Sequence, residues 1–397
     1  MRRRILTPRS DWQSRVEKVG LTFHTLPDGT PYWDESAYWE FSSREIDRLE
    51  AATAEIQRLA LAAGDVILDQ NRFAQFGIMP QAADAIRLAW DGEPPALYGR
   101  LDLAFDGASI KLLEYNADTP TGLVEAAIAQ WFWLQDCFPN SDQFNSLHEK
   151  LIAKWKDLKD YVTDPVYFSD AGSEEDTMTV TYLRDTAQQA GISTRHLRMH
   201  EIGWDAKLGL FLDLDDRPIG TLFKLYPWEW LLNEPFGPNA LATLPPASPL
   251  RTFGPRKDRR QWGSTLWIEP IWKMMWSNKA LLALLWELNP GHELLLPAYL
   301  DGPRELTSYV RKPIFGREGS GISLVRNGKV VEGAPLGPLD SQSPAVFQAL
   351  APMAQEADRT AVFGSWLIDG EPAGMGIRES RGLITNNTSF FVPHLFR

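Results

Sequence analysis

Residues 97–116 read LYGRLDLAFDGASIKLLEYN, and this stretch decides the fold because it predicts a β-hairpin with an unusually polar face. Two strand-like runs, 97–105 and 109–116, flank the turn signal Asp106-Gly107. An Asp-Gly pair between alternating apolar residues is a strong local hairpin signal. The hairpin is therefore the starting point for predicting the rest of the fold.

Each predicted strand carries two chemically active residues at positions i and i+2. These are Arg100 and Asp102 on the first strand, and Glu114 and Asn116 on the second. Side chains alternate along a strand, so the members of each pair share a face. Two carboxylates and an amide oxygen suit Mg²⁺, and an Arg beside them could stabilise a phosphoryl group in transfer. The alternative is a solvated polar face of an antiparallel sheet, which is common.

The loop decides whether the two pairs meet. A two-residue loop at 106–107 would put them on opposite faces, because a one-residue change of register flips every side chain. A three-residue loop at 107–109 sets Asp102 opposite Glu114, with the other two residues also paired. We predict the three-residue loop.

The remaining sequence indicates a mixed α/β and α+β protein. Residues 36–75 look helical, 122–133 form a further helix, and 160–225 alternate strands with helices. Short strands with glycine turns fill the last 90 residues, as in an antiparallel end region. We expect a helical region at 1–95, a central region with the hairpin at 96–230, and nucleotide-binding lobes at 231–397, with a lobe crossing or mobile loop in 232–265.

Composition narrows the class of protein. The chain has 397 residues, 44% hydrophobic, and a net charge of −12, which argues against binding to nucleic acid. With 16 Trp residues, we expect these large side chains to fill seams between lobes. Cys137 is the only cysteine, so no internal disulfide is possible, and its apolar neighbours predict a packed thiol. No segment of membrane-spanning or signal-peptide length is apparent, and a cytoplasmic protein without membrane attachment is expected.

A second polar segment is rich in glycine. Residues 310–322 read VRKPIFGREGSGI, so a strand delivers Lys312 to a loop containing Gly316 and Gly319. Glycine allows the close backbone approach that a phosphate-binding loop needs. The order differs from that of a Walker A loop, and an ordinary hairpin turn is the alternative. Lys279 would lie in the first turn of a helix, where it meets either solvent or an anion.

Taken in order along the chain, these segments resemble the synthetase domain of the glutathionylspermidine synthase family, and its stand-alone acid–amine ligase members in particular. The resemblance runs from about residue 10 to the end. It rests on the blocks Arg100-Leu101-Asp102, Glu114-Tyr115-Asn116-Ala117-Asp118-Thr119-Pro120, Phe223-Lys224-Leu225-Tyr226-Pro227-Trp228-Glu229, Ile268-Glu269-Pro270-Ile271-Trp272-Lys273, Ser277-Asn278-Lys279-Ala280-Leu281-Leu282, Arg311-Lys312-Pro313-Ile314-Phe315-Gly316-Arg317-Glu318-Gly319 and Gly376-Ile377-Arg378-Glu379.

The resemblance implies an ATP-grasp fold preceded by a pre-ATP-grasp region, with ATP and Mg²⁺ as cofactors. Asp102, Glu114 and Asn116 match the family's Mg²⁺ ligands, and Arg100 matches an arginine that stabilises the transferring phosphate. The implied reaction joins a peptide-like carboxylic acid to a polyamine or amino acid through an acyl phosphate.

Further roles follow from the same resemblance. Lys279 and Lys312 match lysines that contact the ATP phosphates and the adenine side, and Arg378 matches a mobile arginine near the reacting groups. Gly316 and Gly319 lie in the glycine-rich loop beside them. The remaining matches are to the adenine pocket, namely Gln348, Ala349, Leu350 and Leu383.

The chain also departs from the family. From its length of 397 residues and the lack of a suitable cysteine, we expect no cysteine amidase of the kind in the two-domain members, and hydrolysis of an amide product is not expected. Thr119 could replace the small hydroxyl residue used for glutathione, whereas the block 224–228 differs around the glutathione position. Glutathione and spermidine are therefore open as substrates. Two other interpretations remain: an ATP-binding regulatory protein or slow ATPase that has lost ligation, and a scaffold without nucleotide.

Overall fold

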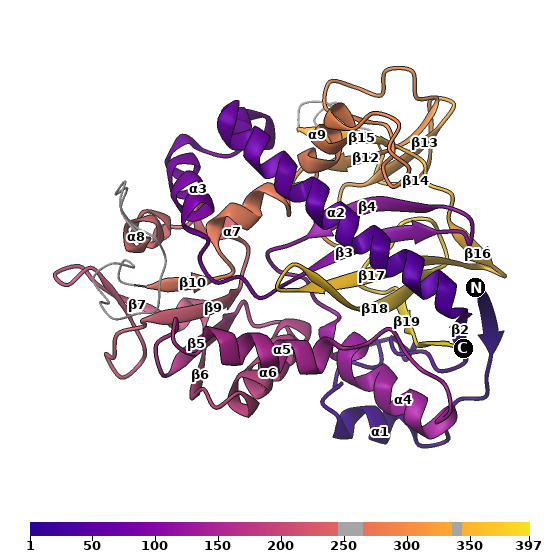
Figure 1. The fold of residues 1–397 in the computed structure, drawn as a ribbon, viewed down its shortest axis with the longest axis horizontal. Coiled ribbons are helices and arrows are strands. Elements are labelled where there is room, and N and C mark those ends of the chain that lie inside the picture. The colour runs from indigo at the N-terminus through magenta and orange to yellow at the C-terminus, as the bar shows by residue number, and fades with distance from the viewer. Residues whose placement is uncertain (245–264, 336–343) are drawn as a thin grey trace.

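The computed structural model describes residues 1–244, 265–335 and 344–397. The helices are α1 (Trp12–Lys18), α2 (Ser43–Asp69), α3 (Pro80–Gly92), α4 (Gln130–Cys137), α5 (Leu147–Leu158), α6 (Glu174–Gln189), α7 (Trp228–Leu231), α8 (Gly237–Thr243) and α9 (Ala280–Leu288). Within this described part of the chain the strands form five separate sheets, which accompany the helices (Figure 1). No helix in these described ranges is long and apolar enough to cross a membrane.

The largest sheet is antiparallel and has the order β19-β18-β17-β3-β4, with β16 paired to β17. Its strands are β3 (Tyr98–Phe105), β4 (Ile110–Asn116), β16 (Ala354–Glu356), β17 (Arg359–Ile368), β18 (Glu371–Ser380) and β19 (Phe390–Val392). The hairpin predicted at 97–116 therefore shares a sheet with four strands from residues 354–392. Figure 1 shows α2 lying diagonally across this sheet.

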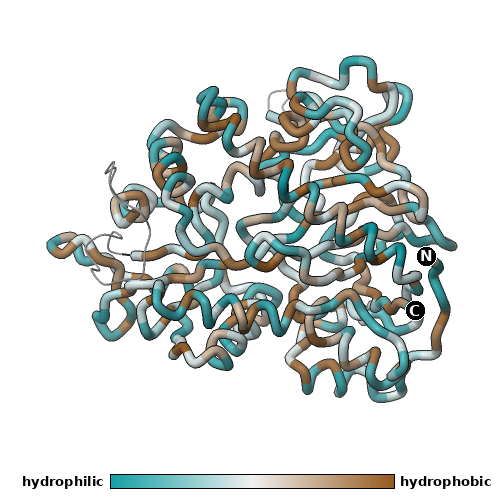
Figure 2. The backbone as a smooth tube through the Cα atoms, in the orientation of Figure 1, coloured by the Kyte–Doolittle hydropathy of each residue, from teal (hydrophilic) through white to brown (hydrophobic). Residues whose placement is uncertain are grey.

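Helix α2 begins at a capping box, in which Ser42 and Glu45 exchange hydrogen bonds with each other's backbone N–H groups. Figure 2 shows hydrophobic and hydrophilic residues alternating along it, as expected for a helix with one buried face. Its buried side includes Leu49 and Ile56. The helical prediction for 36–75 is wrong at its start, because 37–41 form a strand that pairs with both ends of the chain.

A small three-stranded sheet joins those ends. Its order is β1-β2-β20, with strands β1 (Arg2–Ile5), β2 (Ala37–Phe41) and β20 (His394–Phe396). Trp39 and Phe41 of the middle strand are buried against the core. Tertiary pairing at both edges therefore outweighs the local helical pattern.

Two further sheets frame the cavity described below. A parallel sheet of order β10-β9-β5-β6 packs against α6, and a five-stranded sheet of order β11-β15-β12-β13-β14 packs against α9. Residues 160–225 thus alternate strands and helices as predicted. The strands of these sheets and of a small β7–β8 hairpin are β5 (Val166–Asp170), β6 (Thr194–Arg198), β7 (Gly203–Asp205), β8 (Leu210–Leu212), β9 (Thr221–Leu225), β10 (Leu266–Ile268), β11 (Ala298–Tyr299), β12 (Ser308–Pro313), β13 (Ser323–Arg326), β14 (Lys329–Gly333) and β15 (Ala345–Ala349).

Tryptophans pack between elements that are distant in sequence. Trp276 stacks on Tyr115 of β4, meets Trp90 of α3 edge-on, and donates its indole N–H to the carbonyl of Ala60 in α2 at 3.1 Å. This matches the expected role of large amphipathic side chains at seams. Cys137 ends α4 half-buried, and burial raises the pKa of its thiol. The predicted lobe crossing at 232–265 lies largely outside the described residues, apart from α8 and the residues beside it.

Candidate active site

The polar pairs of the hairpin do face each other, as predicted, but for a different reason. Arg100 pairs with Asn116, and Asp102 pairs with Glu114. The predicted three-residue loop is wrong: Phe105 pairs with Ile110, which leaves a loop of four residues.

A β-bulge restores the register. The pairing shifts between Asp102 and Leu103, because Leu103 pairs with Leu112 and leaves Leu113 as an extra residue in β4. One inserted residue moves every later side chain to the other face. The bulge therefore brings the two carboxylates to the same side of the sheet.

The bulge is held by two residues of the neighbouring five-stranded sheet. Lys312 donates from Nζ to the carbonyl of Leu113 at 2.8 Å, and Gln348 donates from Nε2 to the carbonyl of Leu112 at 2.9 Å. Lys312 also donates to Oε1 of Gln348 at 2.8 Å. The predicted phosphate lysine and adenine-contacting glutamine are thus tied directly to the hairpin.

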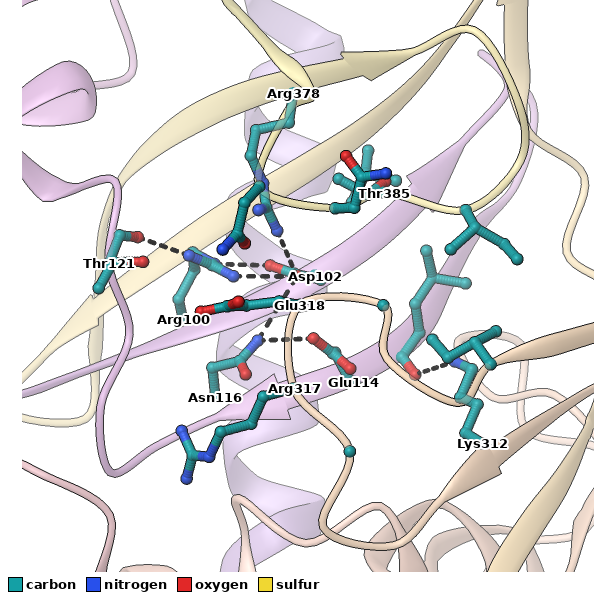
Figure 3. A pocket seen from close by; sticks show the side chains of 18 of the residues that line it. Arg100, Asp102, Glu114, Asn116, Thr121, Lys312, Arg317, Glu318, Arg378 and Thr385 are labelled. Carbon is teal, nitrogen blue, oxygen red and sulfur yellow. Dashed lines mark hydrogen bonds and ion pairs between the residues drawn. The ribbon is translucent and has the colours of Figure 1, made fainter. Parts of the chain in front are cut away.

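A cavity of about 690 Å³ opens at this junction (Figure 3). Every site residue predicted from the sequence lines it, from seven segments of the chain. These residues are Arg100, Asp102, Glu114, Asn116, Thr119, Lys279, Lys312, Gly316, Gly319, Gln348, Ala349, Leu350, Arg378 and Leu383.

Asp102 is the most heavily paired carboxylate of the cavity. Arg100 approaches it with two nitrogens, at 2.6 and 3.1 Å, and Nη2 of Arg378 lies 3.3 Å away. Figure 3 shows the two arginines converging on Asp102 from different strands. Asp102 is only 4% exposed, so these charge-assisted contacts are partly shielded from water.

Glu114 is kept ionised by lysines. Its Oε2 lies 2.9 Å from Nζ of Lys279, and its Oε1 accepts a hydrogen bond from Asn116 at 3.0 Å. Burial alone would raise the pKa of Glu114, but the charges of Lys279 and Lys312 outweigh it and hold that pKa far below its usual range. The carboxylate is therefore an anion at any physiological pH.

The donor set fits a magnesium ion. Mg²⁺ commonly takes one or two carboxylates together with substrate phosphates, and Asp102 and Glu114 present such oxygens on one face. The amide of Asn116 now points its nitrogen at both carboxylates, so a half-turn of that amide would present its oxygen instead. Among the described residues, no group of three or more His, Cys, Asp or Glu side chains is placed so that it could hold a metal ion.

The glycine-rich loop closes one side of the cavity. Lys279 donates from Nζ to the carbonyl of Gly316 at 2.6 Å, which joins the loop to the start of α9. At Gly319, φ is +75° and an added Cβ would lie 2.8 Å from the carbonyl of Thr385. Only glycine fits that approach.

The part of the cavity lined by α6 and Arg317, called the α6 end below, contains residues that were not predicted from the sequence. Arg317 donates to Oγ1 of Thr119 at 2.7 Å and pairs with Glu229 at 2.6 Å. The first turn of α6 adds three acidic residues, 174–176, after the N-cap Ser173. An Asp/Glu-rich first turn is usual for a helix, so only its position beside the cavity distinguishes it.

Negative charge accumulates at this end. Burial raises the pKa of Asp176 to about 6, helped by the charges of Glu175 and Glu318. Burial, with the charge of Glu175, also raises the pKa of Glu125 to about 7. Glu125 accepts a hydrogen bond from Tyr32, which lines the cavity, while its second oxygen is buried with no hydrogen-bond partner in the part of the chain that the structure describes.

The block 224–228 holds the framework of the site together. Lys224 is completely buried, and its Nζ donates to Asp118 at 2.7 Å and to the carbonyl of Tyr226 at 2.9 Å. The backbone N–H of Trp228 also donates to Asp118 at 3.0 Å. This network fixes the segment that precedes Thr119.

Comparison with known proteins bears on both fold and family. Among solved structures, a glutathione synthetase-like effector from Globodera pallida in its apo form is similar, with a TM-score of 0.56 at 10% sequence identity, over 98% of this chain and 96% of that one. At that identity the likeness concerns the fold alone. The ATP-grasp type of fold with a pre-ATP-grasp region, expected from the sequence, is confirmed.

Curated relatives share more sequence. A Haemophilus influenzae protein provisionally named acid–amine ligase is 36% identical over 98% of this chain and 97% of its own length. The bifunctional glutathionylspermidine synthetase/amidase of Escherichia coli (strain K12) is 28% identical, and the trypanothione synthetase of Crithidia fasciculata is 25% identical. The chain spans 59% and 52% of the length of these two. A family described as glutathionylspermidine synthase preATP-grasp matches residues 3–397, and the chain therefore belongs to the glutathionylspermidine synthase family of ligases.

Proposed function

We propose that the protein is an ATP- and Mg²⁺-dependent ligase that joins a carboxylic acid to an amine through an acyl phosphate. One observation carries this proposal: a single cavity brings together two carboxylates, an amide, several cationic side chains and an acidic cluster. The cations closest in role to the hairpin carboxylates are Arg100, Lys279, Lys312 and Arg378. No nucleophilic side chain is needed for phosphoryl transfer, which depends on positioning and charge neutralisation.

The nucleotide end would work as follows. The adenine lies against Gln348, Ala349, Leu350 and Leu383, and the phosphates extend past the two lysines towards the hairpin. Asp102, Glu114 and Asn116 would hold a bound Mg²⁺, and the ion would draw negative charge from the phosphate oxygens of ATP. Arg100 and Arg378, already aimed at Asp102, neutralise the charge that builds on the γ-phosphoryl group as the acid's carboxylate attacks it.

The second step forms the amide. The amine nitrogen attacks the acyl carbon, the C–N bond forms, and inorganic phosphate leaves as the C–O bond breaks. A protonated amine must first lose a proton, and the carboxylates around 174–176 favour the approach of such a cation. The neighbouring arginine, Arg317, bridges Thr119 and Glu229 and is suited to a second carboxylate on a peptide-like acid.

The proposed partners are therefore a small peptide-like acid and a cationic amine, either a polyamine or an amino acid. We further propose that the protein works in the cytoplasm, where ATP is supplied, and that 231–397 contribute most of the nucleotide lobes. Glutathione and spermidine are the first candidates to test, because the names of two relatives include glutathionylspermidine or trypanothione.

The test is a two-substrate screen for ADP release, in which acids and amines are offered singly and in pairs. A ligase releases ADP quickly only when both correct substrates are present. With the acid labelled by ¹⁸O in its carboxylate, one label should appear in the released phosphate, because the acyl phosphate transfers that oxygen. Slow ADP release that is independent of acid and amine would instead identify an ATP-binding protein that has lost ligation.

A further inference from the structure

The loop at 381–387 forms one wall of the cavity, and the carboxylate of Glu332 binds it from another sheet. Five consecutive residues of this loop, 383–387, line the cavity beside the residues expected to meet the nucleotide. Glu332, in β14, accepts hydrogen bonds from the backbone N–H of Leu383 at 2.9 Å and of Ile384 at 3.0 Å. Each carboxylate oxygen takes one N–H group, so both hydrogen bonds are charge-assisted.

These two hydrogen bonds, called the clamp below, join the two sheets that enclose the cavity. Glu332 belongs to the five-stranded sheet with Lys312 and Gln348, whereas the loop follows β18 of the sheet that carries Arg378. Close packing reinforces the contact, since an added Cβ at Gly333 would lie 2.7 Å from Ile384.

Gly382 leaves room for the clamp. An added Cβ there would lie 2.2 Å from Oε1 and 2.7 Å from Cδ of Glu332. Gly382 is not among the residues with positive φ, so its backbone conformation suits alanine as well. An alanine at 382 would therefore cost little in the backbone but would push the Glu332 carboxylate away from the loop.

We infer that Glu332 is a positioning residue for the nucleotide: its carboxylate holds the 381–387 loop as a preformed wall of the binding cavity. The inference rests on the proposed ATP site. Because the wall is already ordered before the nucleotide binds, binding carries no further entropic cost for ordering the loop. Loss of the clamp should therefore act mainly on the dissociation rate, because the loop would open more often around bound nucleotide.

The experiment measures binding of ADP with Mg²⁺ by calorimetry and its dissociation rate by displacement of a fluorescent ADP analogue. Glu332→Ala removes both hydrogen bonds to the loop and should weaken binding about tenfold, because the site is half-exposed and water replaces part of what is lost. Glu371→Ala changes an exposed residue at the start of β18, the strand that precedes the loop, and should leave the affinity for ADP unchanged. Amide hydrogen exchange at Leu383 and Ile384 should speed up only in the first variant.

Gly382 provides a second variant that leaves the carboxylate in place. Gly382→Ala should also weaken binding about tenfold, because it displaces Glu332 sterically. The double variant Glu332→Ala/Gly382→Ala should weaken binding about tenfold rather than about a hundredfold, because both changes break the same contact. All variants should unfold at a temperature near that of the wild type when nucleotide is absent.

Two results would overturn the inference. Wild-type affinity in Glu332→Ala, with the wild-type protein binding ADP normally, would remove the positioning role and leave the proposed function intact. Additive losses in the double variant would also refute it, because the two residues would then act independently. Absence of ADP binding in the wild-type protein would reject the ATP site itself and the inference with it.

Discussion

The two ends of the cavity handle charge in opposite ways. At the hairpin end each carboxylate has a cation within hydrogen-bonding distance, Asp102 with Arg100 at 2.6 Å and Glu114 with Lys279 at 2.9 Å. At the α6 end three acidic residues follow one another in a single helical turn, and burial together with acidic neighbours raises the pKa of Asp176 to about 6. The hairpin end is thus prepared for a metal and phosphates, whereas the α6 end has negative charge that a cationic substrate would neutralise.

The largest effect is expected from removing charge at the hairpin end. Asp102→Asn and Glu114→Gln should each lower ATP turnover by about a thousandfold or more, the size seen when a preorganised charge contact to a transition state is lost. ADP release measures this effect. Asp216→Asn, an exposed change at a residue whose φ of 57° suits Asn, is the matched control and should keep full turnover. Normal turnover in both hairpin variants would mean that this end does not hold the metal.

A smaller effect is expected at Lys312. Lys312→Met keeps much of the side-chain length but removes the charge, and ADP should bind about a hundredfold more weakly. Calorimetry with Mg²⁺ and ADP measures this change. Affinity within about twofold of the wild type would show that Lys312 serves only to hold the bulge.

A change at the α6 end should alter only the KM for the amine. Asp176→Asn should raise the KM for the amine about tenfold, with affinity for ADP unchanged, because one partly exposed charge facing a cation is lost. Added salt should shrink the difference. Asp185→Asn, on the exposed part of the same helix, should change neither quantity. If Asp176→Asn weakened ADP binding and left the amine KM alone, the two ends would not have separate roles.

The smallest effect is a pH dependence. Burial lowers the pKa of Lys312 to about 8, although the charge of Glu114 partly offsets it. Phosphates favour the protonated amine, so affinity for ADP should be constant below about pH 8 and fall as the pH rises through that value. Lys312→Met should remove this inflection. An identical pH profile in that variant would assign the titration to another group.

The contrast between the ends also explains what the sequence could predict. The hairpin was predictable because strand alternation and an Asp-Gly turn are local signals, and the pairing of Asp102 with Glu114 is confirmed. The bulge at Leu113 was not, because its carbonyl and that of Leu112 are bound by Lys312 and Gln348, about 200 residues away. Local patterns carry no information on such contacts.

Other differences between the predicted and the observed structure also arise from contacts between segments that are distant in the sequence. The strand at 37–41 has a helix-like neighbourhood, and pairing with the two chain ends decides its conformation. The acidic turn 174–176 resembles an ordinary helix start, and only the fold brings it to the cavity. The predicted site was gathered from separate segments by family resemblance, since no single spacing links Lys279 to Asp102. Their roles in binding and catalysis stay predictions.

The most direct test of the central claim is a crystal structure with Mg²⁺ and a non-hydrolysable ATP analogue. The account predicts metal bound to Asp102 and Glu114, an Asn116 amide turned to present its oxygen, and a γ-phosphate beside Arg100 and Arg378. The adenine should lie against Gln348. A triphosphate bound elsewhere, with the hairpin carboxylates still paired only to their arginines and lysine, would contradict it.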